Sequence, residues 1–197
     1  MAPPPAPRYG AGLFRQENPM KKLVSCAAAS LVAAVAPAHA DDETWDDIGT
    51  IGEYTLVAAA LGIPAIKGDW TGDLQAAGSL GAATLIATGL KETFPKTRPD
   101  GSDDKSFPSG HTSVSFAAAA TLTNRYGWKV GLPAHALAAF VGASRVEARK
   151  HFVVDVLAGA AIGELTGFLI TEKFDDGVMI LPWADTHGGG VLLVGRF

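Results

Sequence analysis

Two side chains with complementary chemistry, His151 and Asp155, stand four residues apart in the sequence. They open an apolar run, residues 156–170, that predicts a helix, so the two side chains are expected to share one helical face. A carboxylate that binds an imidazole fixes its tautomer and makes it more basic, which suits a nucleophile or a general base. Arg145, just upstream, could hold an anion beside them. The same pair is also an ordinary feature of a helix start, so the function depends on partners elsewhere in the chain.

Two other segments carry residues that interact well with phosphate groups. Lys91 and Arg98 lie at and beyond the end of a predicted core helix, and His111 follows Ser109 and Gly110 at the predicted start of the next one. Ser109 is expected to be the N-cap residue there, and Gly110 permits close approach to the helix N-terminus. Fixed cations and helix N-terminal N–H groups stabilise the negative charge of a phosphoryl group. A phosphoryl-transfer site therefore accounts for all of these residues together.

In order and spacing, these segments resemble the three-part signature of the type 2 phosphatidic acid phosphatase superfamily. That family includes lipid phosphatases, bacterial non-specific acid phosphatases and vanadium haloperoxidases. The resemblance covers roughly residues 54–173. The matching residues are Lys91, then Arg98-Pro99 after six residues, Pro108-Ser109-Gly110-His111, and Ser144-Arg145 followed by His151 after five residues and Asp155 after three more.

The resemblance implies a role for each of these residues. His151 attacks phosphorus to form a phosphohistidine, Asp155 orients the imidazole of His151, and His111 protonates the leaving alkoxide and then activates water. No metal and no cofactor is implied, and the nearby Asp103 and Asp104 are interpreted as part of a solvated loop. The phosphoryl oxygens are expected to be held by Lys91, Arg98, Ser109, Gly110 and Arg145.

This chemistry requires opposite protonation of the two imidazoles at the moment of attack. His151 must be neutral to act as a nucleophile, and His111 must be protonated to act as an acid. An unperturbed histidine titrates near pH ~6.5. A pH optimum on the acidic to neutral side is therefore expected.

Substrate and reaction leave alternatives open. Phosphate monoesters are expected, with lipid phosphate or pyrophosphate ahead of small soluble esters. One alternative is a vanadate-dependent haloperoxidase, in which vanadate occupies the phosphate site and is bound by His151. Another is a phosphate-binding envelope protein on a catalytically dead scaffold. Only eight residues separate Pro99 from Pro108. This gap is short for the family and leaves the usual cap over the site in question.

The elements that must position these residues are helices. Runs of apolar and small residues predict an all-α fold, a single helical bundle of about five core helices with a short C-terminal β-hairpin. Gly62 and Pro64 predict that the first helix is short or broken near its end, and Gly131 and Pro133 predict an interruption early in the helix over residues 128–146. The acidic start, residues 41–47, is expected to be exposed and to carry little chemistry.

The beginning of the sequence predicts export. Met20-Lys21-Lys22, an apolar run and Ala38-His39-Ala40 form the three parts of a secretory signal peptide. Cleavage is expected after Ala40, and translation could start at Met1 or Met20. The expected divisions are 1–40 for leader and signal peptide, 41–174 for a helical phosphatase domain and 175–197 for a C-terminal hairpin extension.

Composition limits the partners. The formal net charge is −4, without a basic stripe, so nucleic acid is not an expected partner. The apolar runs are interpreted as shorter or more polar than the ~20 apolar residues of a spanning helix. A soluble or peripheral periplasmic protein is therefore expected, with a phosphate ester as its partner and with membrane association and a lipid substrate left open.

Overall fold

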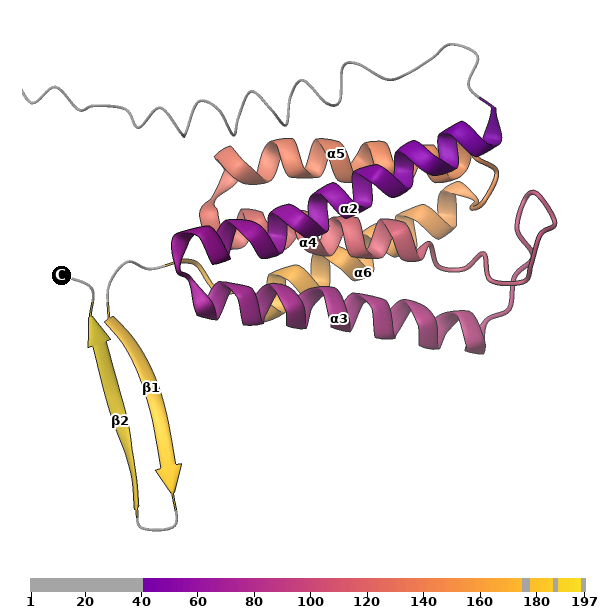
Figure 1. Ribbon diagram of the computed structural model, residues 1–197. Coiled ribbons are helices and arrows are strands. Elements are labelled where there is room, and N and C mark those ends of the chain that lie inside the picture. The colour runs from indigo at the N-terminus through magenta and orange to yellow at the C-terminus, as the bar shows by residue number, and fades with distance from the viewer. Residues whose placement is uncertain (1–40, 175–177, 186–187, 196–197) are drawn as a thin grey trace, which may run out of the picture.

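The computed structural model describes residues 41–174, 178–185 and 188–195, and the predicted leader and signal peptide lie outside these residues. An all-α bundle with five helices in the described part of the chain confirms the predicted fold class (Figure 1). The backbones of β1 (Val178–Asp185) and β2 (Gly188–Gly195) pair antiparallel, with Val178 opposite Gly195. The helices are α2 (Asp42–Lys67), α3 (Trp70–Thr93), α4 (Gly110–Tyr126), α5 (Trp128–Glu147) and α6 (Val153–Ile170).

Short polar side chains fix where the helices begin. Asp41 is the N-cap of α2 and accepts a hydrogen bond from the Thr44 backbone nitrogen at 2.8 Å. Asp69 caps α3 in the same way, and Ser109 caps α4 as predicted. Each cap satisfies one of the backbone N–H groups that a helix leaves unpaired at its start. Ser109 therefore fixes the point where the polar loop between α3 and α4 ends and α4 begins.

The prediction of a short or broken first helix is wrong. Helix α2 is continuous from Asp42 through Pro64 to Lys67, and its C-cap Gly68 adopts a left-handed conformation with φ 65°. The acidic residues 41–47 are its cap and first turns, because carboxylates near a helix N-terminus are favoured by the helix dipole. The acidic segment is therefore part of the bundle.

Helix α5 is also continuous where an interruption was predicted. It includes both Gly131 and Pro133. A Cβ atom built on Gly131 would lie 1.9 Å from Oγ1 of Thr123 in α4. Gly131 is therefore required for the close packing of α5 on α4 and does not break the helix.

Helix α4 runs through the middle of the bundle. It lies between α3 on one side and α2 and α5 on the other, with α6 behind it (Figure 1). Its core-facing residues are small, and four consecutive alanines, residues 117–120, are fully buried. Small side chains let the neighbouring helices approach closely.

Helices α4 and α6 make the most extensive of these contacts. A Cβ atom on Gly159 would lie 2.5 Å from the carbonyl oxygen of Ser109, and one on Gly163 would lie 2.3 Å from that of Ser113. Gly167 packs one turn further along against Ala120. The contacts advance together along both helices, so α4 and α6 are parallel. Their N-terminal ends, next to His111 and His151, therefore lie at the same end of the bundle.

The outer faces of the bundle carry many large apolar side chains. Ile66 is 83% exposed, Leu85 75% and Leu169 82%. Helices α2 and α6 are long and apolar enough to cross a membrane, although buried core helices can pass the same test of length and composition. From the sequence, every apolar run was expected to be shorter or more polar than a membrane-spanning helix. This expectation considered the apolar runs alone and is corrected by the full extent of α2.

Candidate active site

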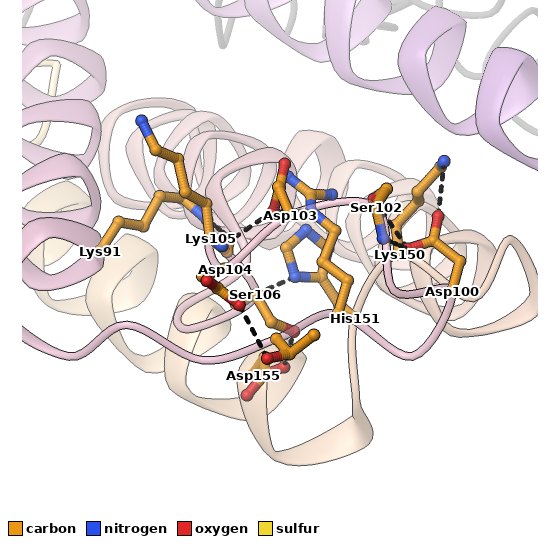
Figure 2. Close-up of polar contacts among 12 residues, drawn as sticks. Lys91, Asp100, Ser102, Asp103, Asp104, Lys105, Ser106, Lys150, His151 and Asp155 are labelled. Carbon is orange, nitrogen blue, oxygen red and sulfur yellow. Dashed lines mark hydrogen bonds and ion pairs between the residues drawn. The ribbon is translucent and has the colours of Figure 1, made fainter.

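His151 lies in the link between α5 and α6 and is only 3% exposed. Its Nδ1 atom is 2.6 Å from the carbonyl oxygen of Ser106 (Figure 2). A carbonyl oxygen can only accept a hydrogen bond, so Nδ1 carries the proton and Nε2 carries the lone pair. Burial, and after it the nearby cations Lys91 and Arg98, lower the pKa of His151 to about 3. The imidazole is therefore neutral at physiological pH, as a nucleophile requires.

Asp155 is linked to His151 through Ser106, which forms a hydrogen bond with each of them. Its Oδ2 atom accepts hydrogen bonds from Ser106 Oγ at 2.6 Å and from the Phe152 backbone nitrogen at 3.0 Å, and its Oδ1 atom accepts one from Lys96 Nζ at 2.7 Å. The sequence argument placed His151 and Asp155 on one helical face, but α6 begins at Val153. His151 precedes the helix, so the carboxylate turns toward the helix start. The imidazole is held by the carbonyl of Ser106, and Asp155 holds Ser106.

His111 lies in the first turn of α4 and faces α2. Its Nε2 atom is 3.4 Å from Oε2 of Glu53. Burial is the main cause that lowers the pKa of His111 to about 4, although Asp46 acts in the opposite direction. At neutral pH this imidazole is therefore uncharged, in contrast to the protonated form expected from the sequence. The cations that add to the lowering are Arg145, Arg98 and Lys91.

Lys91 and Arg98 are both held at the edge of the loop between α3 and α4. Lys91 Nζ donates hydrogen bonds to the carbonyl oxygens of Lys105 and Pro108, each at 2.6 Å. Arg98 Nε is 2.6 Å from Oδ1 of Asp103. Asp103, interpreted from the sequence as part of a solvated loop, therefore anchors one of the predicted phosphate-binding residues.

Arg145, near the end of α5, is 1% exposed and is bound by α2. Its Nη1 atom is 2.5 Å from Oδ1 of Asp46, and Nη2 donates to the carbonyl oxygens of Trp45 and Asp46. A Cβ atom on Gly49 would lie 2.0 Å from Ser144 Oγ, so α2 packs directly against this segment. The first turns of α2, which carry none of the signature residues, thus form one wall of the site.

Ser109 and Gly110 form the start of α4 beside these cations. Ser109 is fully buried; its Oγ atom accepts a hydrogen bond from Thr112 Oγ1 at 2.9 Å, and its backbone nitrogen donates to the carbonyl oxygen of Asp155 at 3.0 Å. A Cβ atom on Gly110 would lie 3.8 Å from Lys91 Cε. The helix N-terminus and the ammonium group therefore lie next to each other.

The structure brings the predicted residues of all three segments to one end of the bundle. Lys91, Arg98 and Arg145 are near enough to influence the charge of His111, and Lys91 and Arg98 also influence that of His151. Sequence reasoning missed four residues in this region: Asp46, Glu53, Lys96 and Ser106. The available signals were the position of Lys96 inside the first matching segment and that of Ser106 two residues before the second.

Binding of inorganic phosphate is expected to raise the pKa of His111 from about 4 toward its ordinary value. An anion among the three cations offsets their charge and favours the imidazolium form. Histidine Cε1 resonances followed by NMR over a pH series, with and without saturating phosphate, measure this change. His135, which is paired with Glu164, is the internal control, and phosphate is not expected to change its resonances. An unchanged or lower pKa of His111 would contradict anion binding here.

Comparisons with known proteins identify the family of this chain. Residues 73–177 match the family model of the PAP2 superfamily. Lipid A 1-phosphatase of Porphyromonas gingivalis is 36% identical over 103 residues, which are 50% of this chain and 23% of that protein. Lipid A 4'-phosphatase of Helicobacter pylori is 32% identical over 117 residues, which are 52% of this chain and 59% of that protein. The chain thus spans less than two thirds of the length of these curated relatives.

Two solved structures share the fold. LpxE of Aquifex aeolicus has a TM-score of 0.58 at 22% identity, covering 73% of this chain and 91% of that one. The transmembrane PAP2 type phosphatidylglycerolphosphate phosphatase from Bacillus subtilis has a TM-score of 0.53 at 27% identity, covering 79% and 86%. Because the family match extends over more than half of the sequence, this protein belongs to the PAP2 superfamily, the family of type 2 phosphatidic acid phosphatases.

Proposed function

We propose that this protein is a phosphatase that hydrolyses phosphate monoesters without a metal ion, through a phosphohistidine on His151. The observation that carries the proposal is the hydrogen bond from His151 Nδ1 to the carbonyl oxygen of Ser106. It leaves the lone pair on Nε2 of a buried, neutral imidazole close to fixed cations. This is the combination that nucleophilic attack on a phosphate ester requires.

In the first step, Nε2 of His151 attacks phosphorus and the bond from phosphorus to the ester oxygen breaks. His111 donates its proton to the departing alkoxide, so the alcohol leaves uncharged. The phosphoryl oxygens are held by Lys91, Arg98, Ser109, Gly110 and Arg145. Both arginines already bind carboxylates, but a guanidinium group has five N–H donors and can bind phosphate as well.

In the second step, water attacks phosphorus while His111 takes one of its protons. The bond from phosphorus to Nε2 breaks, phosphate leaves, and His151 regains its lone pair. The first step needs a protonated His111, whereas His111 is uncharged in the free protein at neutral pH. The negative charge of the bound phosphate dianion favours the imidazolium form of His111 and so supplies the proton donor. Asp155 takes part in both steps as the carboxylate that holds Ser106 in place.

We further propose that the substrates are lipids and that the protein works at a membrane. The relatives named above are phosphatases of lipid A and of phosphatidylglycerol phosphate. The exposed apolar side chains of α2, α3 and α6 provide surfaces suited to contact with lipid. Small soluble esters remain secondary substrates under this proposal.

Export to the periplasm and the domain division are also proposals. The signal peptide predicted over residues 20–40 ends immediately before Asp41, the N-cap of α2. Cleavage after Ala40 leaves the whole of α2, including Asp46 and Glu53, in the mature protein. The phosphatase domain then corresponds to residues 41–174, followed by the extension over residues 175–197.

A side-by-side turnover assay tests this function. The purified protein is given a lipid A analogue, phosphatidate, an isoprenyl pyrophosphate, p-nitrophenyl phosphate and a nucleotide, and phosphate release is measured with and without EDTA. We expect higher kcat/KM for the lipids and no effect of EDTA. Loss of activity in EDTA would contradict the metal-independent mechanism, and preference for the nucleotide would contradict the lipid assignment. Halide oxidation with vanadate and peroxide would instead favour the haloperoxidase alternative.

A further inference from the structure

Two residues outside the three-part signature, Lys96 and Ser106, form a closed frame with Asp155 next to His151. Ser106 Oγ donates to Asp155 Oδ2 at 2.6 Å, Lys96 Nζ donates to Asp155 Oδ1 at 2.7 Å, and the Ser106 backbone nitrogen donates to the Lys96 carbonyl oxygen at 2.9 Å. Figure 2 shows Ser106 between the imidazole of His151 and the carboxylate of Asp155. Each member of the frame is thus bonded to the other two.

The frame determines the direction of the carbonyl group that binds His151. Ser106 and Asp155 are fully buried. The Ser106 backbone is anchored at its nitrogen and its side chain at Oγ, so its carbonyl oxygen has little freedom to turn away from Nδ1 of His151. A fixed acceptor at Nδ1 keeps the proton there and leaves Nε2 free for attack.

Lys96 supplies the charge that this arrangement needs. A buried carboxylate without a cationic partner is strongly disfavoured. The side chain of Lys96 is 35% exposed, against 0% for Asp155, and its ammonium group lies 4.4 Å from the ring centre of Phe152. The cation therefore closes the outer side of the frame while the carboxylate stays inside. Lys96 lies between Lys91 and Arg98 and is not one of the three-part signature residues.

We propose that Ser106 and Lys96 are positioning residues for the nucleophile, an inference that rests on the proposed phosphohistidine chemistry. Ser106 fixes the tautomer of His151 through its carbonyl oxygen, and Lys96 fixes Ser106 through Asp155. The competing role for Lys96 is direct binding of the phosphoryl group. The two roles differ in what they change, because a positioning residue affects the chemical step and a phosphate ligand affects substrate binding as well.

The test uses Ser106→Ala, Lys96→Met and Lys96→Arg in the full chain, with p-nitrophenyl phosphate as the probe. We expect kcat to fall about 10- to 100-fold in the first two variants, as is typical when a supporting hydrogen-bond partner is lost, with KM unchanged. Lys96→Arg is expected to retain most of the activity, because arginine also pairs with a carboxylate. Imidazole ¹⁵N NMR of His151 is expected to show the proton at Nδ1 in the wild type and a mixture of tautomers in Ser106→Ala and Lys96→Met.

Two matched controls bind Asp100 instead of Asp155, one from the link between α5 and α6 and one from the loop between α3 and α4. Lys150 pairs with Asp100 at 2.8 Å with a similarly exposed side chain, and Ser102 Oγ donates to the same carboxylate at 2.7 Å. Asp100 is not part of the frame, so Lys150→Met and Ser102→Ala are expected to leave kcat and the His151 tautomer unchanged.

The outcomes separate this inference from the function on which it rests. An unaltered tautomer or unaltered kcat in both Ser106→Ala and Lys96→Met would overturn the inference, and so would a rise in KM alone in Lys96→Met. If Ser106→Ala unfolds, the comparison of Lys96→Met with Lys96→Arg still decides the question. Normal turnover by a His151→Gln variant would instead overturn the proposed function.

Discussion

A His151→Gln variant is expected to lose about four orders of magnitude or more in phosphate release, comparable to the loss of other nucleophiles or their correct tautomer. Glutamine keeps polarity and approximate size but has no lone pair on nitrogen that can attack phosphorus. The cations and the start of α4 remain, so substrate binding is expected to survive. The loss should therefore appear in kcat rather than in KM.

The covalent intermediate provides the direct measurement. Substrate labelled in its phosphoryl group is mixed with enzyme and quenched in alkali, because phosphohistidine is labile in acid. We expect label on the wild-type protein and none on His151→Gln. With a good leaving group, His111→Gln is expected to accumulate label, because the second step still requires a base for water. Label on the His151→Gln protein would contradict the assigned nucleophile.

His135→Gln is the matched control for this experiment. His135 is also partly buried in the bundle, and its Nε2 atom pairs with Oε1 of Glu164 at 2.7 Å. Its Nδ1 atom lies 2.9 Å from the carbonyl oxygen of Gly131. Thr123 Oγ1 lies 3.2 Å from the same Nδ1 atom, so His135 is a histidine with three structural partners. Its replacement is expected to leave phosphoenzyme formation intact.

The largest expected effect on stability comes from Gly163→Ala. The new Cβ atom would lie 2.3 Å from the carbonyl oxygen of Ser113 and 2.6 Å from the backbone nitrogen of Ala117. Both neighbours are backbone atoms, so no side chain can rotate away and α4 and α6 must separate. We expect the free energy of unfolding to fall by about 1–3 kcal/mol or more, measured by thermal or denaturant unfolding. Activity should fall with it, because His111 lies in the first turn of α4 and His151 immediately precedes α6.

Gly81→Ala and Gly89→Ala are controls of the same chemistry. Both glycines lie inside α3, and a Cβ atom at either position would meet nothing within 4 Å. Alanine is favoured over glycine inside a helix by about 0.5–1 kcal/mol, so these variants are expected to be slightly more stable than wild type. Equal stability of Gly163→Ala and Gly81→Ala would show that the contact between α4 and α6 is looser than described.

The sequence alone was sufficient to predict the family and the helical fold class. It also predicted which residues lie together at one end of the bundle. The three-part signature fixes residue types within short segments, and local rules for helix starts correctly identified Ser109 as a cap. The same reasoning misjudged Pro64, Gly131 and Pro133, because the surrounding bundle overrides local preferences for breaking a helix. The presence of glycine at position 131 is explained only by its contact with Thr123 of the neighbouring helix, which the sequence does not show.

The partners of the site residues could not be predicted in the same way. Asp46 binds Arg145 across 99 residues of sequence, and nothing local in the acidic start indicates that partner. The predicted contact between Asp155 and His151 assumed that both residues belong to one helix, whereas α6 begins after His151. A shift of the helix start by a few residues was enough to give the imidazole a backbone carbonyl as its partner.

The glycine contacts between α4 and α6 also limit how this enzyme can move. Where backbone meets backbone every turn, one helix cannot slide or roll on the other without a collision. His111 and His151, the proposed acid–base residue and nucleophile, are therefore expected to move together as one rigid unit. Any widening of the site to admit a bulky head group must come from the other walls, namely α2 and the loop between α3 and α4. The separation of His111 and His151 is thus set by three glycines on one face of α6, Gly159, Gly163 and Gly167.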